Sequence, residues 1–126
     1  MHRLLMALSA GLGIAAVLIT AAPAASQTVQ TLTCRIHEKS FCEPAVECRR
    51  IDPKVWNLID LTNRTFSRCD SAGCDEYQAT ISRSGDFAII DVPGRGMLAK
   101  LSVSSRLFVE VTTALLGVYV SYGRCE

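Results

Sequence analysis

The sequence predicts an all-β fold, a small antiparallel meander of about seven or eight strands that curls into a barrel or sandwich and is stapled by disulfides. Three observations predict it. Apolar and polar residues alternate with the period of two that strands require. Turn-forming residues separate the alternating segments, and the connections are too short for crossover helices. The chain of 126 residues contains six cysteines, which is typical of a disulfide framework.

The first half of the domain alternates less regularly than the second. Trp56 lies at the centre of one apolar segment and is expected to anchor the core. The segment from Cys42 to Arg50 contains Pro44, which cannot donate to a strand ladder, and is expected to be a loop. The strands expected in this half are residues 31–37, 55–61 and 65–69.

The second half shows clear alternation, interrupted by turn residues. Ser84 and Gly85 are expected to form a hairpin turn, with Gly85 able to adopt a positive φ. The segment 93–96, Pro-Gly-Arg-Gly, breaks the next strand, and residues 104–106 turn the one after it. The strands expected here are residues 77–82, 87–92, 97–103, 107–112 and 115–122.

Residues 1–26 have the three-part order of a secretory signal peptide. A basic start at Arg3 precedes an apolar segment over 4–19, and small residues follow over 20–26. Cleavage is expected after Ala24, Ala25 or Ser26, which leaves one domain, residues 27–126, without a transmembrane segment. The alternative is an uncleaved membrane anchor, because the segment from Leu4 to Ala25 approaches the roughly 20 residues that span a bilayer. The expected location is secreted or periplasmic.

All six cysteines follow the predicted leader and are expected to form disulfides. Six cysteines allow fifteen pairings, and sequence alone does not decide among them. Proximity favours two local bridges and leaves a third between the first and last strands. In the chain-entropy model, each local bridge contributes about 2 kcal/mol and the long one about 4–5 kcal/mol. The favoured pairs are Cys42–Cys48, Cys69–Cys74 and Cys34–Cys125.

A metal site is the competing interpretation of the first cysteines. Cys34, His37, Cys42 and Cys48 have a spacing that could supply four tetrahedral zinc ligands. This arrangement would leave an odd set of three thiols, which tend to oxidise outside the cytosol. The sequence contains no C-x-x-C motif and therefore does not support a thioredoxin-type redox role. We expect no metal and no cofactor.

The charge balance limits the class of partner. Removal of Arg3 with the leader leaves twelve basic and twelve acidic side chains. A neutral domain without a basic cluster is poorly suited to nucleic acid or to an anionic membrane surface. The segment Gly94-Arg95-Gly96 opens no helix and therefore lacks the context of a phosphate-binding loop. We expect the partner to be a protein or a component of the cell envelope.

Catalysis has little support in the sequence. His37 is the only histidine after the leader, and no nucleophile signature accompanies it. We therefore expect no catalytic residues and a small exported, non-catalytic binding or accessory module that acts through disulfide-pinned loops. Glu43, Glu47 and Arg95 are the expected interaction residues of those loops. The alternatives are a small secreted hydrolase that uses His37 with such carboxylates, and a purely structural envelope protein.

Overall fold

The structure, a computed structural model, describes residues 30–126 and confirms an all-β fold. The predicted signal peptide lies outside the described residues. A single 3-10 turn, η1 (Pro93–Arg95), interrupts the succession of strands. The strands are β1 (Thr31–Cys42), β2 (Arg49–Ile51), β3 (Trp56–Asp60), β4 (Thr65–Asp70), β5 (Gly73–Gln78), β6 (Thr80–Ser84), β7 (Phe87–Val92), β8 (Met97–Ser102), β9 (Leu107–Ala114) and β10 (Gly117–Cys125).

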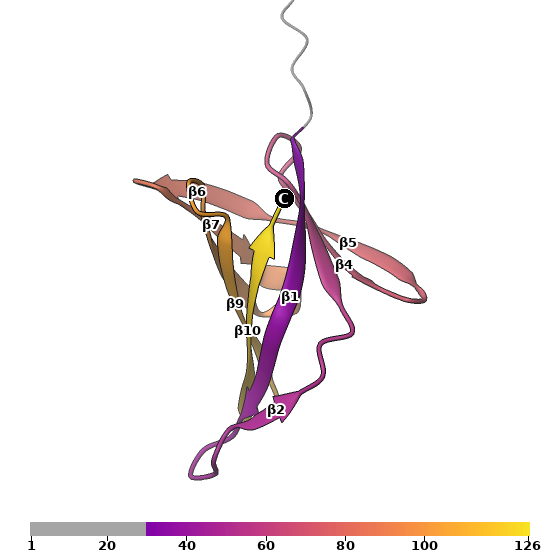
Figure 1. Ribbon diagram of the computed structural model, residues 1–126, viewed down its shortest axis with the longest axis vertical. Coiled ribbons are helices and arrows are strands. Elements are labelled where there is room, and N and C mark those ends of the chain that lie inside the picture. Colours follow the sequence, from indigo (N-terminus) through magenta and orange to yellow (C-terminus); the bar gives the residue numbers. More distant parts are fainter. Residues whose placement is uncertain (1–29) are drawn as a thin grey trace, which may run out of the picture.

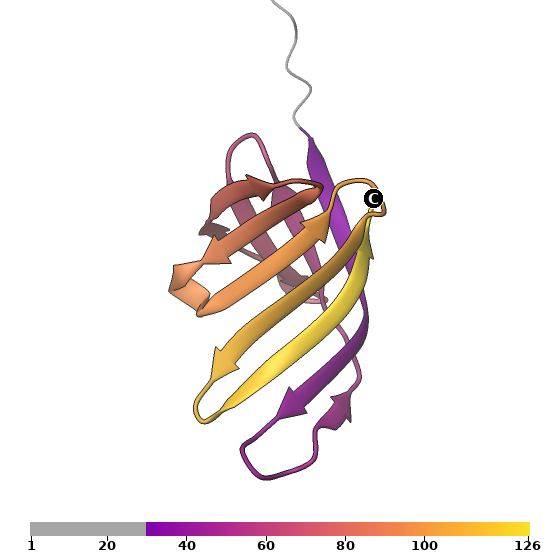
Figure 2. The same cartoon turned by 90° about the vertical axis from the view of Figure 1, so that its left-hand side faces the viewer.

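All ten strands belong to one antiparallel sheet that is nearly closed into a barrel (Figures 1 and 2). The sheet order is β5-β4-β3-β1-β10-β9-β8-β7-β6, and the short β2 pairs with β1. Most pairs join strands that follow one another in the chain, as a meander requires. There are two exceptions. β1 pairs with β3, past the short β2, and β1 pairs with β10, which brings the beginning and the end of the domain together at the middle of the sheet.

The two edges of the sheet meet in a single extended stretch of chain. β5 pairs with β4 as far as Gln78, and β6 pairs with β7 from Thr80 onward. Between them, the backbone N–H of Ala79 donates to the carbonyl of Arg64 at 2.9 Å. The strand expected over 77–82 is therefore divided, because its first part pairs with one wall of the barrel and its second part with the other.

The structure has more strands than the seven or eight expected. The division at Ala79 adds one strand, and β2 adds another within the segment expected to be a loop. The first strand also continues to Cys42, past a β-bulge between Ile36 and Glu38. This bulge lets the strand bend, so that its second half can pair with both β2 and β10.

The core lies between the walls of the barrel and combines apolar side chains with a few buried polar ones. Ala88, Ile90 and Val92 alternate inward along β7, as the period of two predicts. Asn57, Glu110 and Ser121 are also buried. The largest apolar side chains among the fully buried residues are Phe66, Ile59, Ile90, Leu101 and Val92.

Three disulfides join the cysteines in the pairing that the sequence favours. Cys34 and Cys125 face one another across β1 and β10 and are buried in the core. The bridge Cys42–Cys48 closes the loop from β1 to β2, and the bridge Cys69–Cys74 links the hairpin of β4 and β5. Because these thiols are all oxidised, the zinc site considered for the first cysteines has no thiolate ligands.

The two ends of the described chain are hydrogen-bonded to each other. The N–H of Thr33 donates to the carbonyl of Glu126 at 2.8 Å, and the N–H of Glu126 donates to the carbonyl of Thr33 at 2.9 Å. Beside them, Gly123 lies so close to the backbone of Arg35 that a Cβ atom has no room. Within residues 30–126, no helix is long and apolar enough to cross a bilayer.

Candidate functional site

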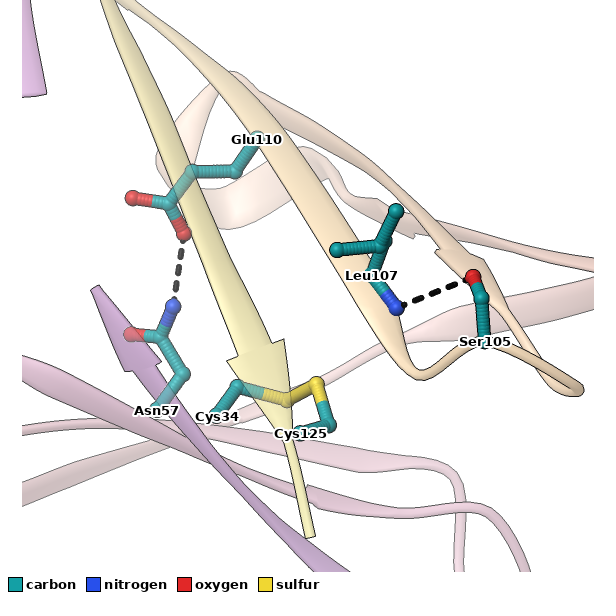
Figure 3. The surroundings of a disulfide bond; sticks show 6 residues. All are labelled: Cys34, Asn57, Ser105, Leu107, Glu110 and Cys125. Carbon is teal, nitrogen blue, oxygen red and sulfur yellow. Dashed lines mark hydrogen bonds between the residues drawn. A yellow bond between two sulfur atoms is a disulfide. The ribbon is translucent and has the colours of Figure 1, made fainter. Parts of the chain in front are cut away.

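A buried carboxylate lies inside the barrel. Glu110 projects inward from the middle of β9, and its side chain is 1% exposed. Asn57 on β3 donates to its Oε2 at 2.7 Å (Figure 3), and Arg68 on β4 donates to its Oε1 at 2.6 Å. A buried charge is costly unless it is paired and hydrogen-bonded. This network therefore fixes β9 against β3 and β4 across the interior.

An open cleft of about 560 Å³ lies beside this network. Arg68 belongs to both, because it lines the cleft and donates to Glu110. The other charged side chains of the cleft come from separate elements: Lys39 from β1, Arg95 from η1, Asp70 from β4 and Asp75 from β5. The remaining lining residues are Val55, Gly94, Thr112, Thr113, Ala114 and Tyr119.

Lys39 is in an electrostatically unfavourable position. Burial lowers the pKa of its amine most, and the nearby positive charge of Arg68 lowers it further. Glu110 opposes this shift, whereas Arg95 adds to it. The Lys39 amine also lies 4.8 Å from the centre of the Tyr119 ring, in a cation–π contact. Two cations of the cleft, Lys39 and Arg95, form no ion pair among the described residues, and we call these two its positive side.

Arg95 belongs to this positive side. Its guanidinium lies 5.3 Å from the centre of the Tyr77 ring, which holds it over the barrel wall. The sequence places Arg95 at the tip of an interaction loop, and the structure does place it on the turn η1. Its side chain lines the cleft together with Lys39, and it therefore belongs to a different surface from Glu43 and Glu47.

The acidic side chains of the cleft lie on the hairpin of β4 and β5. Asp75 is the cross-strand partner of Arg68, and the bridge Cys69–Cys74 lies next to both in the ladder. Asp70 accepts the backbone N–H of Ala72 at 2.7 Å, which supports the hairpin turn. The cleft is therefore bipolar, because it is lined by cations from β1 and η1 and by carboxylates from this hairpin, which also carries Arg68.

A second candidate surface lies at the end of the barrel where two turns come together, and we call it the two-turn end. It consists of the loop closed by Cys42–Cys48 and the turn between β9 and β10 (Figure 2). Cys42 pairs with Val118 in the ladder of β1 and β10, which holds the turns side by side. Three large apolar side chains are exposed at their tips: Val46, Leu115 and Leu116.

Both turns hold a non-glycine residue in the left-handed region of backbone conformation. The φ of Ala45, next to Val46, is 59°, and the φ of Leu115 is 51°. A side chain in this region costs about 1 kcal/mol or more. The sequence thus places a leucine where glycine or asparagine would relieve strain, and leaves this leucine fully exposed. Strained, exposed apolar residues of this kind favour a role in binding over a role in folding.

Glu43 and Glu47, which the sequence predicts to be interaction residues, lie at the two-turn end and away from His37. Glu43 and Glu47 are exposed within the Cys42–Cys48 loop, and neither forms an ion pair within residues 30–126. His37 is exposed at the bulge of β1. The groove beside it is lined by other residues, Glu38 and Asp52 among them, and by neither of these two carboxylates.

Apolar side chains are exposed on the outer face of the barrel at two strands, and one of them differs from the sequence expectation. Trp56, expected in the core, is the cross-strand partner of Cys69 on the outer face and is partly exposed. On β9, Phe108 and Glu110 face inward, so Leu107 and Val111 are left exposed outside. The expectation for Trp56 was wrong because composition alone does not show which face of a strand is buried.

Sequence reasoning missed the main residues of both surfaces. Lys39, Arg68 and Glu110 are far apart in the chain, and only the sheet register brings them together. A signal for Glu110 did exist, because a single acid within the apolar strand Leu-Phe-Val-Glu-Val is unusual. A signal for the two-turn end was the pair Leu115-Leu116 at a turn, where small polar residues are expected.

The fold and these surfaces define a disulfide-bridged, nearly closed antiparallel barrel with a bipolar cleft and two apolar turn tips at one end. The chain matches no protein-family model, no curated protein and no solved structure.

Proposed function

We propose that this chain is a small exported, non-catalytic binding module that engages a protein partner through the two-turn end. The observation that carries the proposal is the exposure of apolar side chains at two adjacent, rigidly held turns. Leu116 is 85% exposed and Val46 is 63% exposed, although water disfavours both. Exposed apolar side chains that cluster in this way commonly mark a protein interface.

The rigidity of the two turns favours binding. The bridge Cys42–Cys48 closes a loop with a sequence separation of 6, and the β9–β10 turn is held by the adjoining ladder. Residues ordered before binding lose little conformational entropy in the complex. The phenyl ring of Phe41 packs against Tyr119 beneath the tips, with 4.7 Å between ring centres. This aromatic pair supports the tips from below.

The charges around the tips indicate the chemistry of the partner. Glu43 and Glu47 are exposed on either side of Val46 in the same loop, so the tip formed by Val46 has an acidic border. A complementary partner would present an apolar pocket with basic side chains at its rim. An anionic membrane surface would repel this border, which favours a protein partner over lipid.

The proposal also includes export, as the leader-like residues 1–26 suggest. Three disulfides are stable in an oxidising compartment and are rare in the cytosol. We therefore propose a secreted or periplasmic location. The hydrolase alternative lacks a comparable observation, since His37 and the carboxylates Glu43 and Glu47 occupy different surfaces.

The test compares capture of partners by three forms of the oxidised protein. A tip variant carries Val46→Ser, Leu115→Ser and Leu116→Ser. A control variant carries Leu98→Ser and Leu107→Ser, which remove exposed apolar side chains from the outer barrel face instead. Proteins from the exported fraction that are retained by each immobilised form are identified by mass spectrometry. Circular dichroism and thiol titration establish that every form is folded and fully bridged.

The expected result is a protein that the native chain and the control variant retain and the tip variant loses. Charge reversal of the acidic border, by Glu43→Lys with Glu47→Lys, should also weaken retention, and more so at low salt. Equal retention by the tip variant would overturn the proposal. Activity in any assay that His37→Ala abolishes would instead support the hydrolase alternative.

A further inference from the structure

We propose that the bipolar cleft binds a small zwitterion, a free amino acid or a short peptide, with its carboxylate between Lys39 and Arg95 and its ammonium group toward Asp70 and Asp75. This site is separate from the two-turn end. Neither the architecture nor the proposed protein partner explains the charge distribution of the cleft.

The positive side of the cleft is prepared for a carboxylate. Lys39 and Arg95 lie over the aromatic rings of Tyr119 and Tyr77, which restrict the positions of both cations. Neither cation forms an ion pair within residues 30–126. Arg68, in contrast, is already neutralised by Glu110. Two positioned cations without a counter-ion, in one open cleft, favour an anionic group between them.

The negative side limits the charge of the ligand. Asp70 and Asp75 line the same cleft and would repel a second anionic group. A polyanion would therefore gain from one side and lose to the other. A ligand with opposite charges at its two ends satisfies both sides, which distinguishes a zwitterion from an inorganic anion.

The size and polarity of the cleft fit such a ligand. A volume of about 560 Å³ is within the range typical of small-molecule sites. Thr112 lines the cleft, and its buried Oγ1 has no hydrogen-bond partner among the described residues. A hydroxyl of this kind is available to an amide or carboxylate group of a peptide. Val55 and Ala114 supply apolar surface for small side chains.

The experiment is an NMR titration of the oxidised, isotope-labelled protein with four probes. The probes are alanyl-alanine, its C-terminal amide, its N-acetyl form and inorganic phosphate. Amide shifts of Thr112 and Thr113 report binding in the cleft, and their dependence on concentration gives Kd. The variant Lys39→Met with Arg95→Met removes the free cations. Lys100→Met is the matched control, because the Lys100 amine also lies over an aromatic ring, that of Phe87, but outside the cleft.

We expect alanyl-alanine to bind and to lose about tenfold or more in affinity when its carboxylate is blocked. The double variant should lose at least as much, and Lys100→Met should bind like the native protein. The native protein should bind alanyl-alanine more tightly than its N-acetyl form, and Asp75→Asn should abolish this preference. Variants are compared only after circular dichroism shows native β structure.

Three outcomes would overturn the inference. One is the absence of saturable shifts at the cleft up to about 10 mM dipeptide. Another is binding of the dipeptide that persists in the double variant. The third is phosphate binding as tight as dipeptide binding, which would indicate a general anion site. All three leave the proposal for the two-turn end untouched, because its tip variant changes no residue of the cleft.

Discussion

Replacement of Glu110 by glutamine should destabilise the barrel strongly, although it changes only one atom of the side chain. Glutamine retains an oxygen that can accept from Asn57, so the hydrogen bond across the interior can persist. The negative charge is lost, and Arg68 keeps a guanidinium whose side chain is only 15% exposed. The substitution therefore isolates the cost of a buried cation without its counter-ion.

The magnitude follows from the burial of the two partners. Removal of one partner of a buried ion pair costs about 3–5 kcal/mol. Arg68 reaches some solvent, so we expect the lower end, about 3 kcal/mol for Glu110→Gln. In a domain of this size, that loss lowers Tm by at least about 12 °C. The double variant with Arg68→Met removes both charges and should recover most of the loss.

The assay is urea unfolding of the four members of this double-mutant cycle, with all disulfides intact. A coupling energy of about 2 kcal/mol or more is expected. The exposed pair Arg35–Glu126, with an N–O distance of 3.1 Å, provides the matched control. Its cycle should give a coupling energy below about 1 kcal/mol. Equal coupling in the two cycles, or a neutral Glu110→Gln variant, would refute the reasoning.

Four further predictions concern stability. Gly123→Ala should cost about 3 kcal/mol or more in urea unfolding, because its Cβ meets a backbone carbonyl of β1, whereas Gly94→Ala, which meets no atom, should be nearly neutral. Removing both cysteines of the β1–β10 bridge should lower the free energy of unfolding by about 4–5 kcal/mol, twice the effect of removing the β4–β5 bridge, because the first bridge closes a much longer loop. Equal losses would contradict this dependence on loop length. Hydrogen bonds from serine side chains lower the pKa of Asp86, so the native protein should be more stable than Asp86→Asn above pH 3.8. In acid unfolding curves, this difference in stability should fade as pH falls through the lowered pKa. The pKa of Lys39 is lowered in the folded state, so the unfolded chain binds more protons than the folded chain just below pH 10.5. In thermal melts, the stability of the native protein should therefore rise as pH approaches 10.5. Lys39→Met should lack this rise and should be more stable than the native protein at neutral pH.

The elements that sequence predicts best are those whose signals are local. The strand over 87–92 has the predicted bounds, because a hairpin turn precedes it and a Pro-Gly break follows it. The local bridges are also predictable, since short loops favour them. The third bridge follows once the first and last strands are expected to meet, and the register of Cys34 with Cys125 confirms that meeting.

The remaining features depend on register, which the sequence does not show. Strand β9 has apolar side chains on both faces, and only its pairing with β8 and β10 decides that Phe108 and Glu110 lie inside. Arg68, the partner of Glu110, is 42 residues away in the chain. The cleft depends on the same long-range arrangement, since the cations that line it come from different elements.

The pairing of the first strand with the last constrains how the chain acquires its oxidised form. In a polypeptide that emerges from its N-terminus, the thiol of Cys34 becomes available first and must wait for that of Cys125, the last of the six. Oxidation in order of appearance would join Cys34 to the next thiol along the chain and give an incorrect isomer. Correct maturation therefore requires either delayed oxidation or rearrangement by thiol–disulfide exchange. A disulfide isomerase should increase the yield of native protein far more than an oxidant alone.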